Sequence, residues 1–450
     1  MATKVTIKQE NKLYHADCLE MLKTLESNSV DAVITDPPAG IAFMSKDWDK
    51  DKGGRDKWIA WMTEVMTECN RVLKHGGHAI VWALPRTSHW TAMAIEDAGF
   101  EIRDVIHHIF NQGFSKSMNV GKALDKKLGN EREVVGKSKR HNSKEFGGEK
   151  YGKYQGGVPC ATKGKSEWEG WGTHLKPAAE HWILARKPIA EKTIVEQVLK
   201  TGTGAINIDG CKIPILENDD VIAKNPHTAS KGTDAYNVNC YGKYNATTEN
   251  PKDYKKISEE SGRFPANVVV TGSALDDGEI TKSPSGSVNR KKRGGNVFTN
   301  HSCGFKSENN DTSGFGDEGL KSRYFDIDLW AEKNGIMNIP KPAKSEKDKG
   351  CQNMPLRRCE TEDADGIKKE MRRNFHPTVK SIKLMAWFVK LISKEGDVVL
   401  DPFAGSGSTL VAAKRMSRKY IGIEKEAEYI PVINARLNDE VNLFDFEYDE

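Results

Sequence analysis

Two stretches far apart in the sequence combine acidic residues with residues that shape the backbone. The first is TDPPAG, in which Asp36, Pro37, Pro38 and Ala39 directly follow the apolar run VDAVI. Two consecutive prolines remove two backbone donors and favour extended geometry, so they hold the aspartate rigidly at a strand end. A carboxylate held in this way can accept hydrogen bonds from a bound group. The alternative is that the prolines only terminate the strand.

The second stretch is VVLDPFAGSGSTLVAA, which places Gly405 and Gly407 between an apolar strand and the start of a helix. Glycines let the backbone approach a ligand closely, and the N–H groups of a helix start favour electron-rich atoms. The next expected strand ends in Glu424, which lies 424 − 407 = 17 positions after Gly407. An acidic residue there suits ribose hydroxyls. A tight packing turn followed by a surface glutamate is the alternative.

The glycine turn differs from the turns that bind pyrophosphate. Gly405-Ser406-Gly407-Ser408-Thr409-Leu410 has no third glycine at the GxGxxG spacing, and the Gly-Lys-Ser/Thr of a P-loop is absent from it. The pattern therefore favours a nucleoside without a phosphate tail, and S-adenosylmethionine fits that description.

Alternating strand and helix patterns must position the two stretches. Up to about residue 210, strands are expected at 12–16, 30–35, 78–84, 100–110 and 181–188, and helices at 17–27, 58–73 and 92–99, the long one closed by His75-Gly76-Gly77. After residue 370 the pattern returns, with helices at 380–393, 408–417 and 426–438 and strands at 397–403 and 419–424. This alternation predicts an α/β fold with a mostly parallel, doubly wound sheet.

Taken together, DPPAG, the distant DPFAGSGS and IGIE resemble the amino-group DNA methyltransferases, which modify N6 of adenine or N4 of cytosine. The order of the motifs is similar to that of their β class. The resemblance implies a Rossmann-like S-adenosylmethionine-dependent methyltransferase fold with a circularly permuted motif order. It makes 1–210 and 371–450 the two halves of the catalytic domain, and 211–370, rich in Gly, Asn, Ser and Lys, an inserted target-recognition region.

The permuted order predicts which strands are neighbours. In a doubly wound sheet of order 3-2-1-4-5, strands 1 and 4 meet at the switch point, and ligands bind beyond their carboxyl ends. If LDPF ends strand 1 and VITDPP ends strand 4, Asp401 and Asp36 meet although 401 − 36 = 365 positions separate them. The stretch KLYHAD then lies beside KYIGIE as strand 3.

The resemblance also implies roles for individual residues. Asp36, Pro37, Pro38 and Ala39 occupy the catalytic motif, in which Asp36 and the Pro37 carbonyl accept hydrogen bonds from the target amino group. Asp17 is alternatively a helix N-cap, and Phe403 is alternatively a core residue. The residues expected at the cofactor are Asp17, His376, Lys380, Asp401, Phe403, Gly405, Gly407, Ser408, Thr409 and Glu424.

Ala39 departs from the family pattern, which has an aromatic residue after the two prolines to stack on the extruded base. Base–aromatic stacking is worth roughly 1–3 kcal/mol. Three explanations are open: another ring, from Phe43, Trp48 or Trp82, replaces it; the site is slow; or the pocket takes a bulkier base. Two of these rings lie in GIAFMSKDWDKDKGGRD, whose glycine pair suggests a mobile flap, so replacement is the favoured explanation.

Within the family, an aspartate before the two prolines favours N6 of adenine, with N4 of cytosine as the alternative. A DNA-binding protein that has lost catalysis is a rival from another class. The resemblance implies S-adenosylmethionine as cofactor and double-stranded DNA with a flipped target base as partner. No metal site is expected, and the sequence leaves open whether the chain forms a homodimer or has a partner nuclease.

Composition limits the remaining classes of protein. The chain has 450 residues, of which 37% are hydrophobic and 29% charged, without an apolar run long enough for a membrane helix or a signal core at 1–12. A soluble cytoplasmic protein is therefore expected. Its net charge is +4, and basic runs such as 289–295 and 371–380 are either DNA contacts or solvated loops. The eight cysteines form no CxxC pair, which favours free thiols over a zinc or disulfide scaffold.

Overall fold

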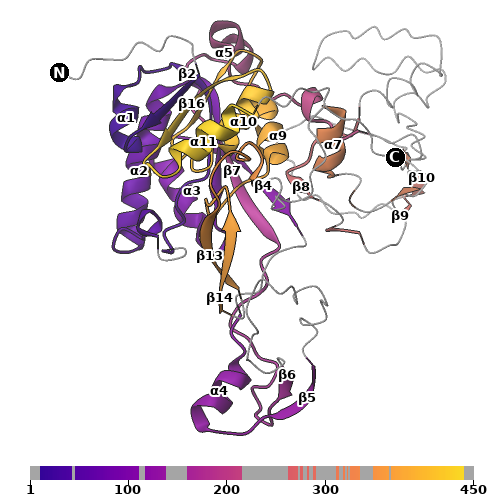
Figure 1. Ribbon diagram of the computed structural model, residues 1–450. Coiled ribbons are helices and arrows are strands. Elements are labelled where there is room, and N and C mark those ends of the chain that lie inside the picture. The colour runs from indigo at the N-terminus through magenta and orange to yellow at the C-terminus, as the bar shows by residue number, and fades with distance from the viewer. Residues whose placement is uncertain are drawn as a thin grey trace, which may run out of the picture. The chain divides into compact units, whose positions relative to one another are not determined.

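A computed structural model describes residues 11–42, 46–110, 117–137, 160–214, 262–271, 274–276, 281–282, 287–289, 311–313, 318–319, 322, 325–334, 348–363 and 366–439. Its central feature is an eight-stranded sheet in the order β1-β16-β15-β2-β3-β7-β4-β8 (Figure 1). The strands are β1 (Lys12–His15), β2 (Val30–Thr35), β3 (Leu73–Ala83), β4 (Glu101–Ile109), β7 (Ala179–Arg186), β8 (Val268–Val270), β15 (Val398–Asp401) and β16 (Lys419–Glu424).

The sheet is parallel from β1 to β3, where consecutive pairs β1–β16, β16–β15, β15–β2 and β2–β3 all run in the same direction. β7 then runs antiparallel between β3 and β4, and β8 pairs in parallel with β4. β1, β16, β15, β2 and β3 therefore occupy the positions 3-2-1-4-5, as the motif order predicts. The Rossmann-like, circularly permuted methyltransferase fold is confirmed.

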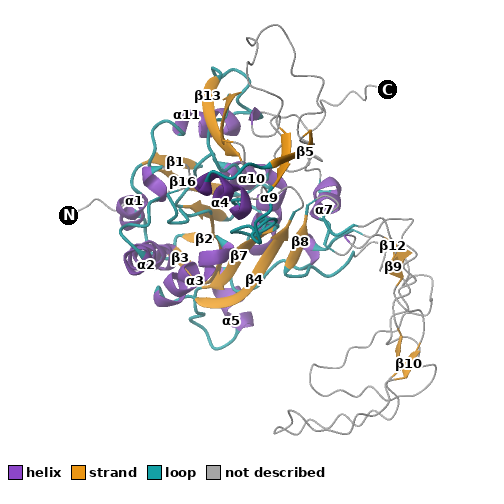
Figure 2. Cartoon of the chain, turned by 90° about the horizontal axis from the view of Figure 1, so that it is seen from below, coloured by secondary structure: helices purple, strands orange, loops and turns teal. Residues whose placement is uncertain are grey.

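Helices cover both faces of this sheet, which explains why a strand such as β2 is buried along its whole length. Figure 1 shows the indigo and purple helices on one side of the sheet and the orange and yellow ones on the other. Figure 2 shows β3, β7, β4 and β8 following one another in the order of the sheet. These helices are α1 (Cys18–Thr24), α2 (Arg55–Val72), α3 (Ser88–Asp97), α5 (Ile194–Thr201), α7 (Ile327–Lys333), α9 (Ile382–Ile392), α10 (Ser408–Arg415) and α11 (Ile430–Leu437).

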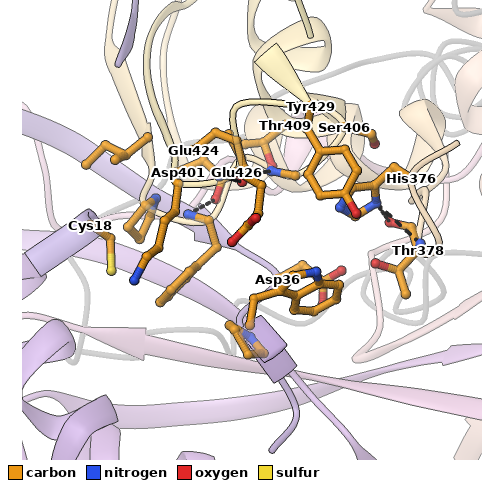
Figure 3. A pocket seen from close by; sticks show the side chains of 18 of the residues that line it. Cys18, Asp36, His376, Thr378, Asp401, Ser406, Thr409, Glu424, Glu426 and Tyr429 are labelled. Carbon is orange, nitrogen blue, oxygen red and sulfur yellow. Dashed lines mark hydrogen bonds between the residues drawn. The ribbon is translucent and has the colours of Figure 1, made fainter. Parts of the chain in front are cut away.

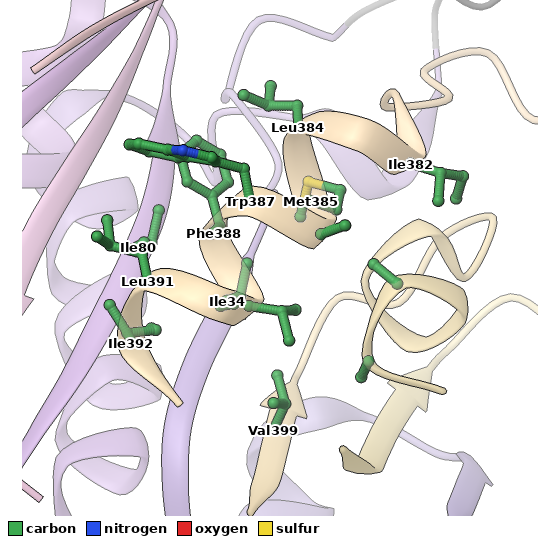
Figure 4. Packing of buried hydrophobic residues seen from close by; sticks show 14 of the residues in the cluster. Ile34, Ile80, Ile382, Leu384, Met385, Trp387, Phe388, Leu391, Ile392 and Val399 are labelled. Atoms are coloured by element: carbon green, nitrogen blue, oxygen red, sulfur yellow. The ribbon is translucent and has the colours of Figure 1, made fainter. Parts of the chain in front are cut away.

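Two apolar clusters bind the helices to the sheet. One lies between α9 and the strands, and it includes Met385 and Phe388 of α9 together with Ile34 of β2 and Val399 of β15 (Figure 4). The other lies on the opposite face, where α1, α2 and α3 pack against the same strands through residues that include Leu22, Met62, Met66, Val81 and Leu400. Since successive strand residues point to opposite faces, one strand supplies both clusters.

The expected helix end at His75-Gly76-Gly77 is wrong. α2 ends at Val72, and β3 begins at once with Leu73 and runs through the glycine pair. The cause is pairing with the chain after β7: the Gly76 N–H donates to the Lys187 carbonyl at 3.1 Å, and the Lys187 N–H donates to the Gly77 carbonyl at 2.9 Å. A tertiary partner therefore overrides a pattern that is typical of a helix end.

The contacts divide the chain into two compact units, 1–111 with 179–358 and 371–450, and 112–178 with 359–370. The second unit contains α4 (Val120–Leu128), β5 (Glu133–Lys137) and β6 (Cys160–Lys163). There the Arg132 guanidinium is paired with Asp125 and Glu169.

Much of the expected target-recognition region 211–370 lies outside the described residues. Of its described part, β8 and α7 belong to the unit that holds the main sheet. The other short elements of the whole chain are η2 (Asp47–Asp49), η3 (Pro85–Thr87), η5 (Asp209–Cys211), β9 (Thr281–Lys282), β10 (Ser287–Asn289), β11 (Asp311–Ser313), β12 (Glu318–Gly319), β13 (Arg357–Asp363) and β14 (Gly366–Arg372). Across the described residues, none of the helices has the length and apolar character needed to cross a membrane.

Candidate active site

A cavity of about 260 Å³ lies beyond the carboxyl ends of β2, β15 and β16 (Figure 3). Asp36 follows β2, while Asp401 ends β15 and Glu424 ends β16, so three neighbouring strands each bring a carboxyl group to it. The sequence-predicted residues that line the cavity are Asp17, Asp36, Pro38, Trp48, His376, Lys380, Asp401, Phe403, Gly405, Ser408, Thr409 and Glu424. The two motifs therefore meet at one site.

Four of the described residues that were predicted for the site do not line the cavity. Pro37 and Ala39 flank the cavity-lining Pro38 in the chain, and Gly407 shapes the turn before α10. Trp82 lies beside the cavity, with the Lys380 ammonium 4.2 Å from the centre of its ring. Phe43 lies outside the described residues, so its expected role stays a prediction.

The glycine turn has a backbone that other residues would strain. Gly405 and Gly407 have φ angles of +54° and +76°. A side chain at Gly405 would place its Cβ 3.0 Å from Nε2 of His376, and one at Gly407 would approach Cγ2 of Ile433 to 2.8 Å. The glycines are thus required both by their backbone angles and by close packing.

Glu424 holds the turn in place through its carboxylate. Its Oε2 accepts a hydrogen bond from the Gly405 N–H at 2.7 Å, and its Oε1 accepts one from the Glu426 N–H at 2.7 Å. The residue is only 7% exposed, and burial raises its pKa to about 7. Each oxygen keeps a lone pair for a hydroxyl donor from the cavity.

Asp401 locks the two motif strands together. Its Oδ1 accepts hydrogen bonds from the Thr35 hydroxyl at 2.7 Å and from the Phe403 N–H at 3.1 Å. Burial raises its pKa to about 6, against the effect of these hydrogen bonds. Because Thr35 directly precedes Asp36, this contact fixes the DPPAG motif relative to the glycine turn.

Asp36 faces an ammonium group across the cavity wall. Lys380 Nζ lies 3.4 Å from Oδ2 of Asp36, and the two side chains are 12% and 21% exposed. Burial raises the pKa of Asp36 to about 6; Lys380 acts to lower this pKa, and the carboxyl groups of Glu180 and Asp401 act to raise it.

Asp17 both caps helix α1 and lines the cavity, which are the two places expected for it. Its Oδ1 accepts a hydrogen bond from the Leu19 N–H at 3.0 Å and so caps α1, while its Oδ2 lies 3.1 Å from Lys425 Nζ. The N-cap interpretation is confirmed, and the residue also lines the cavity.

An aromatic group closes the cavity on the side of His376. The His376 ring meets the Tyr429 ring edge-on at 4.5 Å and lies nearly parallel to Trp48, with centroids 6.3 Å apart. Burial lowers the pKa of His376 to about 3, so its ring is neutral at physiological pH. The loop that carries Trp48 is tied to the DPPAG motif by Asp49, whose carboxylate accepts a hydrogen bond from the Gly40 N–H at 3.1 Å.

The sequence analysis missed several residues of the site. They are Cys18, Asp47, Lys52, Trp61, Met385, Ser406, Lys425, Glu426 and Tyr429 in the cavity wall, and Glu180 and His108 behind Lys380. Lys425 and Glu426 directly follow the predicted Glu424 at the same strand end, a position that could have identified them. Glu180 precedes a strand-like run and carries no pattern of its own.

The kinds of side chain around the cavity indicate what it can hold. Six carboxyl groups line it against three lysines, the carboxyls being Asp17, Asp36, Asp47, Asp401, Glu424 and Glu426 and the lysines Lys52, Lys380 and Lys425. Such a wall suits hydroxyl and amino donors and a positively charged group, and it disfavours phosphate. S-adenosylmethionine, with ribose hydroxyls, an amino group and a sulfonium, fits this donor set.

Comparison with known proteins agrees with the motifs. The family model of the N6/N4 DNA methylases matches residues 30–435. The chain belongs to this family. The family membership expected from DPPAG, DPFAGSGS and IGIE is thereby confirmed.

Individual relatives match over short segments. The type II methyltransferase M2.LlaDCHI of Lactococcus lactis subsp. cremoris is 45% identical over 71 residues, 16% of this chain and 26% of that protein. M2.DpnII of Streptococcus pneumoniae is 48% identical over 65 residues, 14% of this chain and 24% of its own length. The chain thus matches about a quarter of the length of these relatives. The solved PvuII DNA methyltransferase, cytosine-N4-specific, is similar with a TM-score of 0.43 and 12% identity, covering 98% of this chain and 90% of that one.

Proposed function

We propose that the chain transfers a methyl group from S-adenosylmethionine to the N6 amino group of adenine in DNA. The observation that carries this proposal is the single cavity shared by Asp36 and the glycine turn with Glu424. One motif alone would give a strand end or a nucleoside pocket. Because both motifs line one cavity, a hydrogen-bond acceptor for an amino group lies beside a site for a methyl donor.

The cofactor residues proposed here act by holding and orienting. Glu424 accepts hydrogen bonds from the ribose hydroxyls, and the turn around Gly405 lets the backbone approach the ligand. Phe403 and Asp17 contact the adenosine part, while neutral His376 and Thr409 belong to the wall around the rest of the ligand. When bound, the cofactor supplies an electrophilic methyl group.

Asp36 and the Pro37 carbonyl prepare the acceptor. An exocyclic amine is a poor nucleophile because its lone pair is delocalised into the base. Two hydrogen bonds, from the amine to the Asp36 carboxylate and to the Pro37 carbonyl, localise that lone pair and aim it at the methyl group. Pro37 and Pro38 lack N–H groups that would compete for the same carboxylate. Catalysis is then mainly orientation and preorganised electrostatics.

The ring that replaces the missing aromatic at Ala39 is proposed to be Trp48. It lines the same cavity as Asp36, and the loop that carries it is tied to the motif through Asp49 and Gly40. Trp82 is a weaker candidate because the Lys380 ammonium lies 4.2 Å from its ring centre. The target base must leave the duplex to reach this cavity.

The test is incubation of the purified protein with isotopically labelled S-adenosylmethionine and mixed double-stranded DNA, followed by nucleoside mass spectrometry. We expect labelled N6-methyladenine, and its loss with Asp36→Ala. N4-methylcytosine would instead support the alternative base. Absence of any product would support the binding-only rival, and DNA footprinting with Asp36→Ala would then show binding without catalysis.

Two further features belong to the proposal. The region 211–370 is proposed to read the target sequence, and double-stranded DNA is its partner. A homodimer is compatible with this function and is tested by light scattering with and without DNA. A partner nuclease forms no part of the proposal.

A further inference from the structure

The Lys380 ammonium lies between two carboxylates rather than against one. Its Nζ is 3.4 Å from Oδ2 of Asp36 and 3.4 Å from Oε1 of Glu180. The resemblance to the family had suggested Lys380 as a cofactor residue. The contacts of its ammonium group instead connect it to the catalytic motif, and the nitrogen lies 4.2 and 5.6 Å from the centres of the Trp82 and Trp182 rings.

On its other side, Glu180 is held by hydrogen bonds that run through His108 to Thr271. Its Oε2 lies 3.3 Å from Nδ1 of His108, its register partner on the neighbouring strand β4. Nε2 of the same ring lies 2.7 Å from the Thr271 hydroxyl, at the end of β8. His108 and Thr271 are 4% and 8% exposed, so this support is buried.

The backbone of Lys380 is fixed as well. Its carbonyl accepts a hydrogen bond from the Ser408 hydroxyl at 3.0 Å, at the first residue of α10. The side chain therefore starts from an anchored position beside the glycine turn and ends at the catalytic motif.

The charges that face Asp36 act in opposite directions. The Lys380 ammonium stabilises the ionised carboxylate, and the carboxyl groups of Glu180 and Asp401 destabilise it. Lys380 in turn lowers the pKa of Glu180 to about 2 together with His108, against the effect of burial. Glu180 thus remains charged and competes with Asp36 for the same ammonium.

We propose that Lys380 and Glu180 are opposing positioning residues for Asp36. Lys380 holds the Asp36 carboxylate ionised and oriented toward the cavity. Glu180, held by His108, shares the ammonium and so keeps Asp36 a strong hydrogen-bond acceptor. Neither residue contacts the target base; both act through Asp36. The consequence for methyl transfer rests on the proposed function, whereas the effect on the carboxylate does not.

The proposal predicts shifts of opposite sign. Removing the ammonium with Lys380→Met should raise the pKa of Asp36 by about 1–3 units, because an opposite charge at this distance has that effect. Removing the competing charge with Glu180→Gln should lower it by roughly one unit, because the ammonium then serves Asp36 alone. Lys380→Arg keeps the charge and should stay within about half a unit of the wild type. A residue with only a structural role would not give this pattern.

The carboxyl group can be titrated directly by NMR. The full chain is labelled with ¹³C at the aspartate carboxyl carbons, and the Asp36 resonance is identified by its absence in Asp36→Asn. Its titration is followed from pH 4 to 9 in the wild type and the three variants, with melting curves to verify folding. Where the product assay detects methylation, the acidic limb of the rate profile should move in the same directions.

Shifts in the same direction for Lys380→Met and Glu180→Gln, or none in either, would overturn the proposal. Should Lys380→Met fail to fold, the downward shift in Glu180→Gln and the wild-type value in Lys380→Arg still decide the matter. The titration needs no methyl donor. Opposite shifts without any methylated product would therefore refute the proposed function and leave this inference standing.

Discussion

Binding of the methyl donor should depend on pH near neutrality because of Glu424. Burial raises the pKa of this carboxyl group to about 7, and both of its oxygens already accept backbone hydrogen bonds. Ribose hydroxyls donate to the ionised form. Affinity should therefore be nearly full at pH 8 and decline as the pH falls through 7.

The size of the effect follows from the ionised fraction. With a pKa of about 7, the group is about 90% ionised at pH 8 and about 10% at pH 6. If only the ionised form binds, Kd rises about tenfold between these pH values, or about 1.4 kcal/mol. Near pH 7 binding should release about half a proton, because the ligand draws the half-protonated group into its ionised form.

Other groups at the site change little over most of this range. His376, with a pKa of about 3, stays neutral. Asp401 and Asp36 have pKa values of about 6, so they add to the effect only near the acidic end. The matched control is Glu424→Gln, which keeps the shape of the side chain and has no charge to lose between pH 8 and 6.

The assay is isothermal titration calorimetry of S-adenosylmethionine at pH 6, 7 and 8, in two buffers of different ionisation enthalpy. Comparison of the two buffers gives the number of protons released. Equal Kd values at pH 6 and 8 for the wild type would refute the reasoning. So would a Glu424→Gln variant that retains the full pH dependence.

Three further predictions concern the base, the turn and the core. Ala39→Tyr should raise the rate of methyl transfer to DNA less than about threefold if Trp48 already supplies the stacking ring. A rise of about tenfold or more would indicate that the natural site lacks such a ring, because a stacked base is worth roughly 1–3 kcal/mol. Gly405→Ala should weaken S-adenosylmethionine binding by about tenfold or more in calorimetry, because its Cβ would lie 3.0 Å from His376 at a φ of +54°; unchanged affinity would argue against the close approach. Met62→Ala, at a fully buried site, should lower the free energy of unfolding in urea by about 2–5 kcal/mol, whereas Met93→Ala, 39% exposed, should change it by less than about 0.5 kcal/mol.

The arrangement of the sheet was predictable because two short motifs each mark a strand end. Once LDPF and VITDPP are assigned to neighbouring strands, the order of five strands follows, and Asp36 and Asp401 must lie near each other. Glu424 could be assigned in the same way from the strand after the glycine turn. These predictions depend on local backbone chemistry, which the sequence states directly.

The supports of the site were not predictable in this way. Glu180 and His108 are polar residues on two adjacent strands, and only the register of β7 on β4 makes them partners. The turn at His75-Gly76-Gly77 was misassigned for a related reason, since its partner, Lys187, is more than a hundred positions away. A single sequence does not reveal which distant residue satisfies a polar group.

The position of β2 in the sheet also matters for the order in which the protein can fold during synthesis. β2 is buried along its length, with β3 on one side and β15 on the other. β3 follows it closely, but the ribosome adds β15 more than 360 residues later. Until then one edge of a mainly apolar strand, which is fully buried in the folded protein, has no native neighbour, and pairing across so long a loop is slow. Nascent chains should therefore depend on chaperones until the glycine turn emerges, because exposed apolar edges aggregate.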